Sequence, residues 1–229
     1  MAITTRYPRL LLPPSTVTVT QMGRRSLGPA ALDDSRQLQL GAGGFWQIEL
    51  SGVGVWTPDQ SRVWRSIASR LIRGRTVAIP VYDHRQAPFL PGVMPDVTSH
   101  ADGTWFDDGS GYLTPAIIAE LAAPAELRDE IVSIRMIRGA ALQGGEYLSL
   151  THPVWGECLY QTDGIVDVAG DVYTVSIWPG LREDAAAGDP VEFDDPRATC
   201  WLAADGAMAD TRTSEIMTRR SVTMVEWNP

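Results

Sequence analysis

The sequence predicts a mainly β protein, an antiparallel β-sandwich or barrel-like fold that carries one amphipathic helix over residues 58–73. Three observations lead to this prediction. Short runs alternate apolar or β-branched residues with polar ones, which is the period of a half-buried strand. Gly-Gly, Gly-Asp and Asp-Gly steps separate these runs, and glycine supplies the positive φ that tight turns require. One segment instead repeats its apolar residues at spacings of three and four, the period of a helix.

The expected strands begin near the N-terminus and continue along most of the chain. Residues 15–21 (STVTVTQ) alternate threonine and valine, and residues 45–51 (FWQIELS) place glutamine and glutamate between apolar neighbours. In residues 75–82, Pro80 favours a sheet edge or a strand end, because proline has no N–H to donate to a ladder. The remaining expected strands lie at residues 116–122, 130–137, 146–150, 157–168, 172–178, 191–193, 199–202 and 221–227.

The expected helix has clear signals at both ends. Thr57 is a capping residue, Pro58 follows at the first helical position, and Gln60 completes a capping box. Gly74 marks the end, because glycine adopts the left-handed conformation common after a helix. The apolar residues that form one face are Val63, Trp64, Ile67, Leu71 and Ile72. We interpret the arginines on the other faces as solvated, and the last two also suit the negative end of the helix dipole. They are Arg62, Arg65, Arg70 and Arg73.

A long loop divides the chain into two parts. Residues 83–112 are rich in proline, glycine and aspartate and show little regular pattern. We expect an N-terminal half, residues 1–110, that carries the helix and this loop, and an all-β C-terminal half, residues 111–229, either as two units or as one continuous domain. A loop of this length in a compact fold is usually functional or an interaction arm.

Charge and composition exclude several classes of protein. All 19 cationic side chains are arginines, and 28 acids bring the net charge to −9. We therefore expect no stable nucleic-acid binding, which needs a local excess of cations. No apolar run reaches the ~18 residues of a membrane span, and the apolar stretch at the start is too short for a signal peptide.

Cys158 and Cys200 are expected to be small buried side chains, and the histidines are too scattered for zinc.

The densest acidic cluster comprises Asp102, Asp107 and Asp108 in the long loop. A calcium loop or a catalytic carboxylate pair is one interpretation, but the spacing lacks the alternating acids and final glutamate of an EF-hand. Turns capped by aspartate side chains fit better, so these residues stay weak metal candidates. No G-x-S-x-G, GxGxxG or Walker loop is present. We therefore expect no enzymatic activity, no catalytic residues and no cofactor.

Tryptophan is abundant, with eight residues. We expect most of them to pack in the core or between subunits, because each buries a large apolar area. Trp46, Trp64 and Trp105 are the main packing or interface candidates. The alternative interpretation is a platform that stacks on sugars, with Trp105 or Trp155 exposed.

The order of elements resembles the distal-tail (baseplate ring) proteins of long-tailed bacteriophages. In the N-terminal half, the resemblance rests on the strand GFWQIEL at 44–50, the helix that ends in LIRGR at 71–75, and the strand IPV at 79–81. In the C-terminal half it rests on three further segments, LQGGEYLSL at 142–150, IWPGLRE at 177–183 and GDPVEF at 188–193.

The resemblance implies a mostly β protomer that assembles as a hexameric ring in the virion, at the tail tip, after assembly in the host cytoplasm. Its partners would be other copies of the chain, the tail-tube protein and the hub or baseplate protein. Arg75 and Arg182 lie in the shared segments and are further packing or interface candidates. The alternatives are a carbohydrate-binding module for host-surface recognition and a hydrolase that uses the aspartate cluster.

Overall fold

A computed structural model describes residues 5–23, 25–30, 36–40, 43–81, 87–91, 96–98, 104, 112–204, 206–208 and 218–228. The chain forms two compact units. The first, here the sheet unit, comprises Met1–Val81, Thr151–Leu159 and Arg197–Pro229; the second, the barrel unit, comprises Tyr82–Leu150 and Tyr160–Pro196. The predicted halves met near residue 110, whereas each unit draws on several segments, because late strands return to the first sheet.

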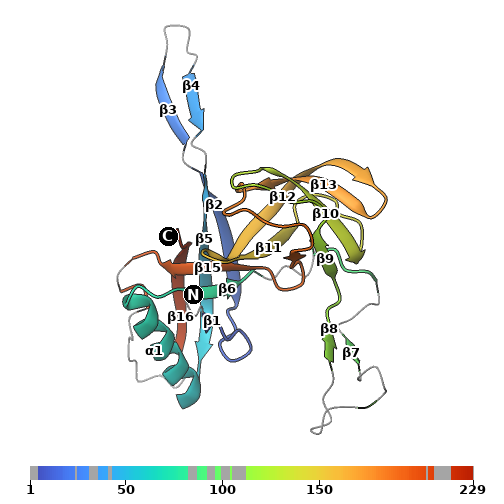
Figure 1. Ribbon diagram of the computed structural model, residues 1–229. Coiled ribbons are helices and arrows are strands. Elements are labelled where there is room, and N and C mark those ends of the chain that lie inside the picture. The colour runs from blue at the N-terminus through green and yellow to red at the C-terminus, as the bar shows by residue number, and fades with distance from the viewer. Residues whose placement is uncertain are drawn as a thin grey trace. The chain divides into compact units, whose positions relative to one another are not determined.

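The sheet unit is built on one six-stranded sheet, shown in Figure 1. Its strands, in spatial order, are β1 (Thr5–Arg6), β6 (Val77–Pro80), β15 (Arg197–Leu202), β16 (Thr218–Glu226), β5 (Phe45–Val55) and β2 (Thr16–Met22). Only β1 and β6 run parallel among the strand pairs of this sheet, and the others are antiparallel. The alternation in residues 15–21 predicted β2 correctly, because Val17 and Val19 are half-buried and the threonines between and beside them are exposed.

Helix α1 (Pro58–Ile72) contacts β5 and β15 of this sheet. Its capping box is confirmed, since the Thr57 hydroxyl accepts from the Gln60 N–H and the Gln60 side chain accepts from the Thr57 N–H. At the other end, the Gly74 N–H donates to the Leu71 carbonyl and the Arg75 N–H to the Arg70 carbonyl. This pair of bonds is a Schellman motif, which needs a left-handed residue at Gly74, and φ there is +73°.

The barrel unit holds the second six-stranded sheet, to which two strands contribute only part of their length. Its order is β11 (Tyr147–His152), β12 (Gly156–Ala169), β13 (Val172–Trp178), β10 (Ile131–Arg138), β9 (Ile118–Leu121) and β14 (Pro190–Val191). Directly after β14, Glu192 exchanges two backbone hydrogen bonds with Ser149 of β11, each 2.9 Å long. Because this bridge joins the two ends of the strand order, the sheet is nearly closed into a barrel.

Two further hairpins complete the strands. One pairs β3 (Arg25–Ala30) with β4 (Arg36–Leu40), and the other pairs β7 (Asp96–Thr98) with β8 (Tyr112–Thr114). Strand β7 lies within residues 83–112 and β8 begins at the last of them, Tyr112. The prediction of a loop without regular structure is therefore wrong at β7, where three residues pair with a strand that continues beyond the predicted loop. The mainly β class with a single helix is confirmed for the described residues.

Each unit has its own core. In the sheet unit, the largest fully buried side chains include Trp46, Trp64, Ile48 and Leu50. In the barrel unit they include Tyr160, Phe193, Ile134 and Leu148. Burial of such aromatic and aliphatic area is the main favourable term that holds each unit together.

Candidate functional site

Strand β2 forms an uncovered edge of the sheet unit. It pairs with β5 from Thr16–Ser51 to Met22–Phe45 without a register shift, and no other described strand lies on its outer side. The strand TVTVTQM contains no charge and no proline. Natural proteins usually block such an edge with charges, proline or a bulge, because its free N–H and C=O groups accept another strand. The described part of β2 carries none of these blocks.

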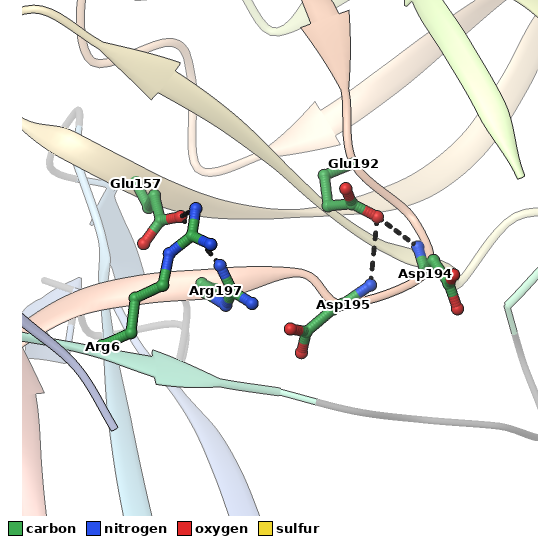
Figure 2. Close-up of polar contacts among 6 residues, drawn as sticks. All are labelled: Arg6, Glu157, Glu192, Asp194, Asp195 and Arg197. Atoms are coloured by element: carbon green, nitrogen blue, oxygen red, sulfur yellow. Dashed lines mark hydrogen bonds and ion pairs between the residues drawn. The ribbon is translucent and has the colours of Figure 1, made fainter. Parts of the chain in front are cut away.

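The opposite end of the same sheet is short and fixed by ion pairs. Arg6 of β1 and Arg197 of β15 both bond the carboxylate of Glu157, at 2.9 and 3.1 Å (Figure 2). The Glu157 side chain is only 15% exposed, so its charge needs these cations nearby. Through Glu157, this contact links the two-residue strand β1 to β15. The two ends of the sheet therefore differ in length, chemistry and strand direction.

The outer face of α1 is cationic. Opposite the buried Trp64, Ile67 and Leu71 lies an exposed row of arginines, here the cationic stripe. It comprises Arg62, Arg65 and Arg73. Residues 57–76 hold five arginines and one acid, a net charge of +4 in a chain whose total is −9. The prediction of a solvated arginine face is consistent with this exposure, and the structure adds that the charge is concentrated along one row.

The hairpin of β12 and β13 has the opposite charge. Here the acidic hairpin denotes residues 163–173, which contain aspartates and no cation. Two bulges in β12 insert extra residues at Asp163 and Val166. Val166 and Val168 are 58% and 50% exposed, and Asp163 and Asp167 are exposed beside them. Bulges re-aim side chains and are common at functional edges.

Two buried or loop carboxylates in the barrel unit have structural roles. Figure 2 shows Glu192 accepting from the N–H groups of Asp194 and Asp195, at 2.8 and 3.1 Å, which shapes the turn after the barrel closure. Glu146 is 4% exposed, and its carboxylate accepts from the backbone of Gly144 and the hydroxyl of Thr162, among other donors. Sequence analysis placed Glu146 at a strand start and missed this role: Gln143 and Gly144 donate from the turn just before it, and only Thr162 comes from a distant strand.

The predicted packing residues fall into two groups. Trp46 and Trp64 are buried as expected: the Trp46 indole N–H donates to the Leu159 carbonyl at 2.7 Å, and the Arg220 guanidinium lies 5.6 Å from the Trp64 ring. Arg75 is exposed after α1, and the Arg182 N–H donates to the Tyr160 hydroxyl at 3.1 Å. The structure therefore supports core roles for the tryptophans and does not bring the two arginines together with them.

The remaining candidates, Trp105, Asp102, Asp107 and Asp108, lie outside the described residues.

Both cysteines are buried free thiols, as predicted. Burial raises the pKa of the Cys200 thiol well above its ordinary value, and the charges of Glu226 and Cys158 raise it further. The backbone N–H of Trp46 donates to the Glu226 carboxylate at 3.1 Å. A thiol kept protonated and away from solvent is a poor nucleophile.

The part of the chain that the structure describes contains no group of three or more His, Cys, Asp or Glu arranged to hold a metal ion. Its one helix is too short and too polar to cross a membrane. No protein-family model and no curated protein matches the sequence.

Two exposed tryptophans were not singled out by sequence analysis. Trp56 is 55% exposed before α1, where its ring lies over Gly54, and Trp201 is 43% exposed on β15. Trp201 lies next to the buried Cys200 and two residues from the buried Thr199, so the strand pattern gave no signal of its exposure.

Proposed function

We propose that the chain is a structural virion protein of a phage tail tip, whose copies form a ring that joins the tail tube to the hub, baseplate and fibres. The observation that carries this proposal is the uncovered edge of β2. The strand has no charge or proline, its alternate residues direct backbone donors and acceptors away from β5, and such an edge pairs with a further strand. The sequence resemblance to distal-tail proteins supports the same assignment and a hexameric ring.

The two ends of the sheet differ, so a contact between them would be of the head-to-tail kind that builds a ring. One end of the sheet is the long antiparallel β2, and the other is the short parallel β1 anchored through Glu157. In a ring, β2 of one copy would lie beside the opposite end of the next copy. Contacts between different surfaces of successive copies close into a ring when the rotation allows it.

The test is the mass of the particle in solution. Purified wild-type chain, at roughly tens of micromolar, is expected to give one discrete multimer by light scattering, because assembly depends on protomer concentration. The variant with Thr18→Lys and Thr20→Lys places two charges on β2 and is expected to remain monomeric, with an unchanged circular dichroism spectrum.

The control variant carries the same two charges on a strand without a free edge. Ser221→Lys and Thr223→Lys lie on β16, which has β5 on one side and β15 on the other. This variant is expected to assemble like wild type. A wild-type chain that stays monomeric at this concentration, alone and after mixing with tail-tube protein, would contradict the proposal.

A carbohydrate-binding module is the second candidate, and the exposed indoles of Trp56 and Trp201 favour it. An exposed aromatic ring is the usual platform for stacking on a sugar face, although rings also anchor protein contacts. Binding to an array of host-surface glycans that disappears with Trp56→Ala or Trp201→Ala would support this function. No bound glycan on the array would reject it.

A further inference from the structure

The cationic stripe and the acidic hairpin have opposite charges, and each also has exposed apolar side chains. Ile72, at the end of α1, is 67% exposed beside the stripe, and Val166 and Val168 are exposed within the hairpin. Stable interfaces combine apolar contact with charges of opposite sign, because exposed ion pairs alone contribute little to the free energy of association. Each of the two surfaces therefore offers both parts of such a contact.

We propose that the acidic hairpin of one copy docks on the cationic stripe of the next copy. This inference rests on the ring proposed above and names a second pair of surfaces within it, separate from the β2 edge. Asp163 and Asp167 would face the arginines of α1, and Val166 would cover Ile72. Complementary charge sets the register of the contact and suppresses wrong partners.

The sign of the charges determines the occupant. A two-fold contact of α1 with α1 would place the stripe arginines against one another, and two acidic hairpins would repel in the same way. The stripe therefore needs an acidic surface that lies elsewhere on its partner. A second copy supplies such a surface in the acidic hairpin, where residues 163–173 contain three aspartates and no cation, and where Arg135 of β10 lies 3.8 Å from Asp171, away from Asp163 and Asp167 in the sequence. A contact between two different surfaces also matches the head-to-tail arrangement of a ring.

A charge swap within the chain tests this contact. One variant reverses the stripe with Arg62→Glu, Arg65→Glu and Arg73→Glu. A second reverses the hairpin with Asp163→Arg and Asp167→Arg, and a third combines both sets. We expect each single reversal to raise the concentration needed for half-assembly at least about tenfold, because like charges then meet at the contact. The combined variant is expected to recover most of the loss, since the charges are again opposite.

The control carries the same charge change at arginines outside the stripe. Arg128→Glu, Arg138→Glu and Arg219→Glu are expected to assemble at the wild-type concentration. Thermal unfolding of every variant shows that the chain is folded. Higher salt is expected to weaken wild-type assembly more than that of either single reversal, because salt screens attraction between exposed charges.

The outcomes separate this inference from the proposed function. If wild type assembles and the stripe reversal assembles equally well, or if the combined variant is no better than its parents, the hairpin contact is wrong while the ring stands. If the stripe reversal instead abolishes binding of an acidic tail protein and leaves the ring intact, the partner is that protein and the self-contact is wrong. If wild type never assembles, both proposals are wrong.

Discussion

The sheet unit and the barrel unit differ in whether the outermost strands of their six-stranded sheets are joined to each other by hydrogen bonds. In the barrel unit, the two hydrogen bonds between Glu192 and Ser149 connect the ends of the strand order. In the sheet unit, β2 ends the sheet with seven residues and no described strand beyond it. Closure removes the edge and with it the tendency to pair with other chains, whereas an open edge keeps this tendency.

The two units therefore offer different chemical groups for contacts. The six-stranded sheet of the barrel unit closes through the Ser149–Glu192 bridge, and the acidic hairpin exposes aspartate and valine side chains. The sheet unit keeps backbone groups available, and its cationic stripe lies on the helix that covers the sheet. Variants that change one unit at a time separate the two contributions.

The largest effect is expected for the core beneath the helix. Trp64→Ala removes a side chain that is 1% exposed and should lower the free energy of unfolding by roughly 3–5 kcal/mol. Urea unfolding followed by circular dichroism measures this loss. Trp56→Ala, at a residue that is 55% exposed, is the matched control and should lose far less. Equal losses at the two positions would show that the helix does not anchor the sheet unit.

Breaking the backbone bridge that closes the barrel should leave both units with an unpaired sheet edge. Glu192→Pro removes the N–H that donates to the Ser149 carbonyl, and we expect a loss of about 1–3 kcal/mol together with aggregation through the freed edge. Glu192→Ala keeps this N–H and loses only the side-chain bonds to the following turn. Urea unfolding and light scattering of the two variants isolate the bridge. If the proline variant matches the alanine variant in both measurements, the closure is unimportant.

Alkaline pH should weaken the sheet unit first. Burial raises the pKa of the Cys200 thiol above its ordinary value of 9.0, and burial also raises the pKa of Tyr7 above 10.0. The folded state then keeps protons that the unfolded state releases. The stabilising contribution is complete below about pH 9 and falls as pH rises, by up to about 1.4 kcal/mol per pH unit for each group.

Urea unfolding at about pH 8, about pH 10 and about pH 11 measures this slope. Cys200→Ala should flatten the first part of the decline, and Tyr7→Phe the part above the ordinary pKa of tyrosine. A decline that is identical in Cys200→Ala and wild type would contradict the role of the thiol.

The smallest effect is expected at the end of α1. Gly74→Val forces a β-branched residue into a φ of +73° and should cost about 1 kcal/mol, although no atom lies within 4 Å of the added Cβ. Gly74→Asn, which tolerates this conformation better, should cost less. A thermal melt of the valine variant that overlays wild type would show that the left-handed turn is not strained.

The sequence predicted most strands and the helix because their signals are local. The alternation in β2 and β5 follows from a side-chain period of two, and the capping box at Thr57 lies within four residues. Closure of the barrel could not be predicted, because it depends on Ser149 and Glu192, which carry no pattern of their own. Strand β1 could not be predicted either, since two residues are too few to show a period.

The candidate surfaces were only partly visible in the sequence. The arginines of α1 were recognised, but the pattern of β2 is the same whether a strand lies on one side of it or on both. The exposure of Val166 depends on bulges that shift the alternation of β12, so the sequence alone assigned it no role. Which edge stays open is a property of the assembled sheet.

Amide hydrogen exchange along β2 tests the central proposal most directly. The outward N–H groups of an uncovered edge exchange quickly, and pairing with another strand slows them. We predict that β2 amides exchange quickly in dilute monomer and become protected when the chain assembles, while protection in the barrel strands changes little. Unprotected β2 amides in a fully assembled particle would show that copies associate without this edge.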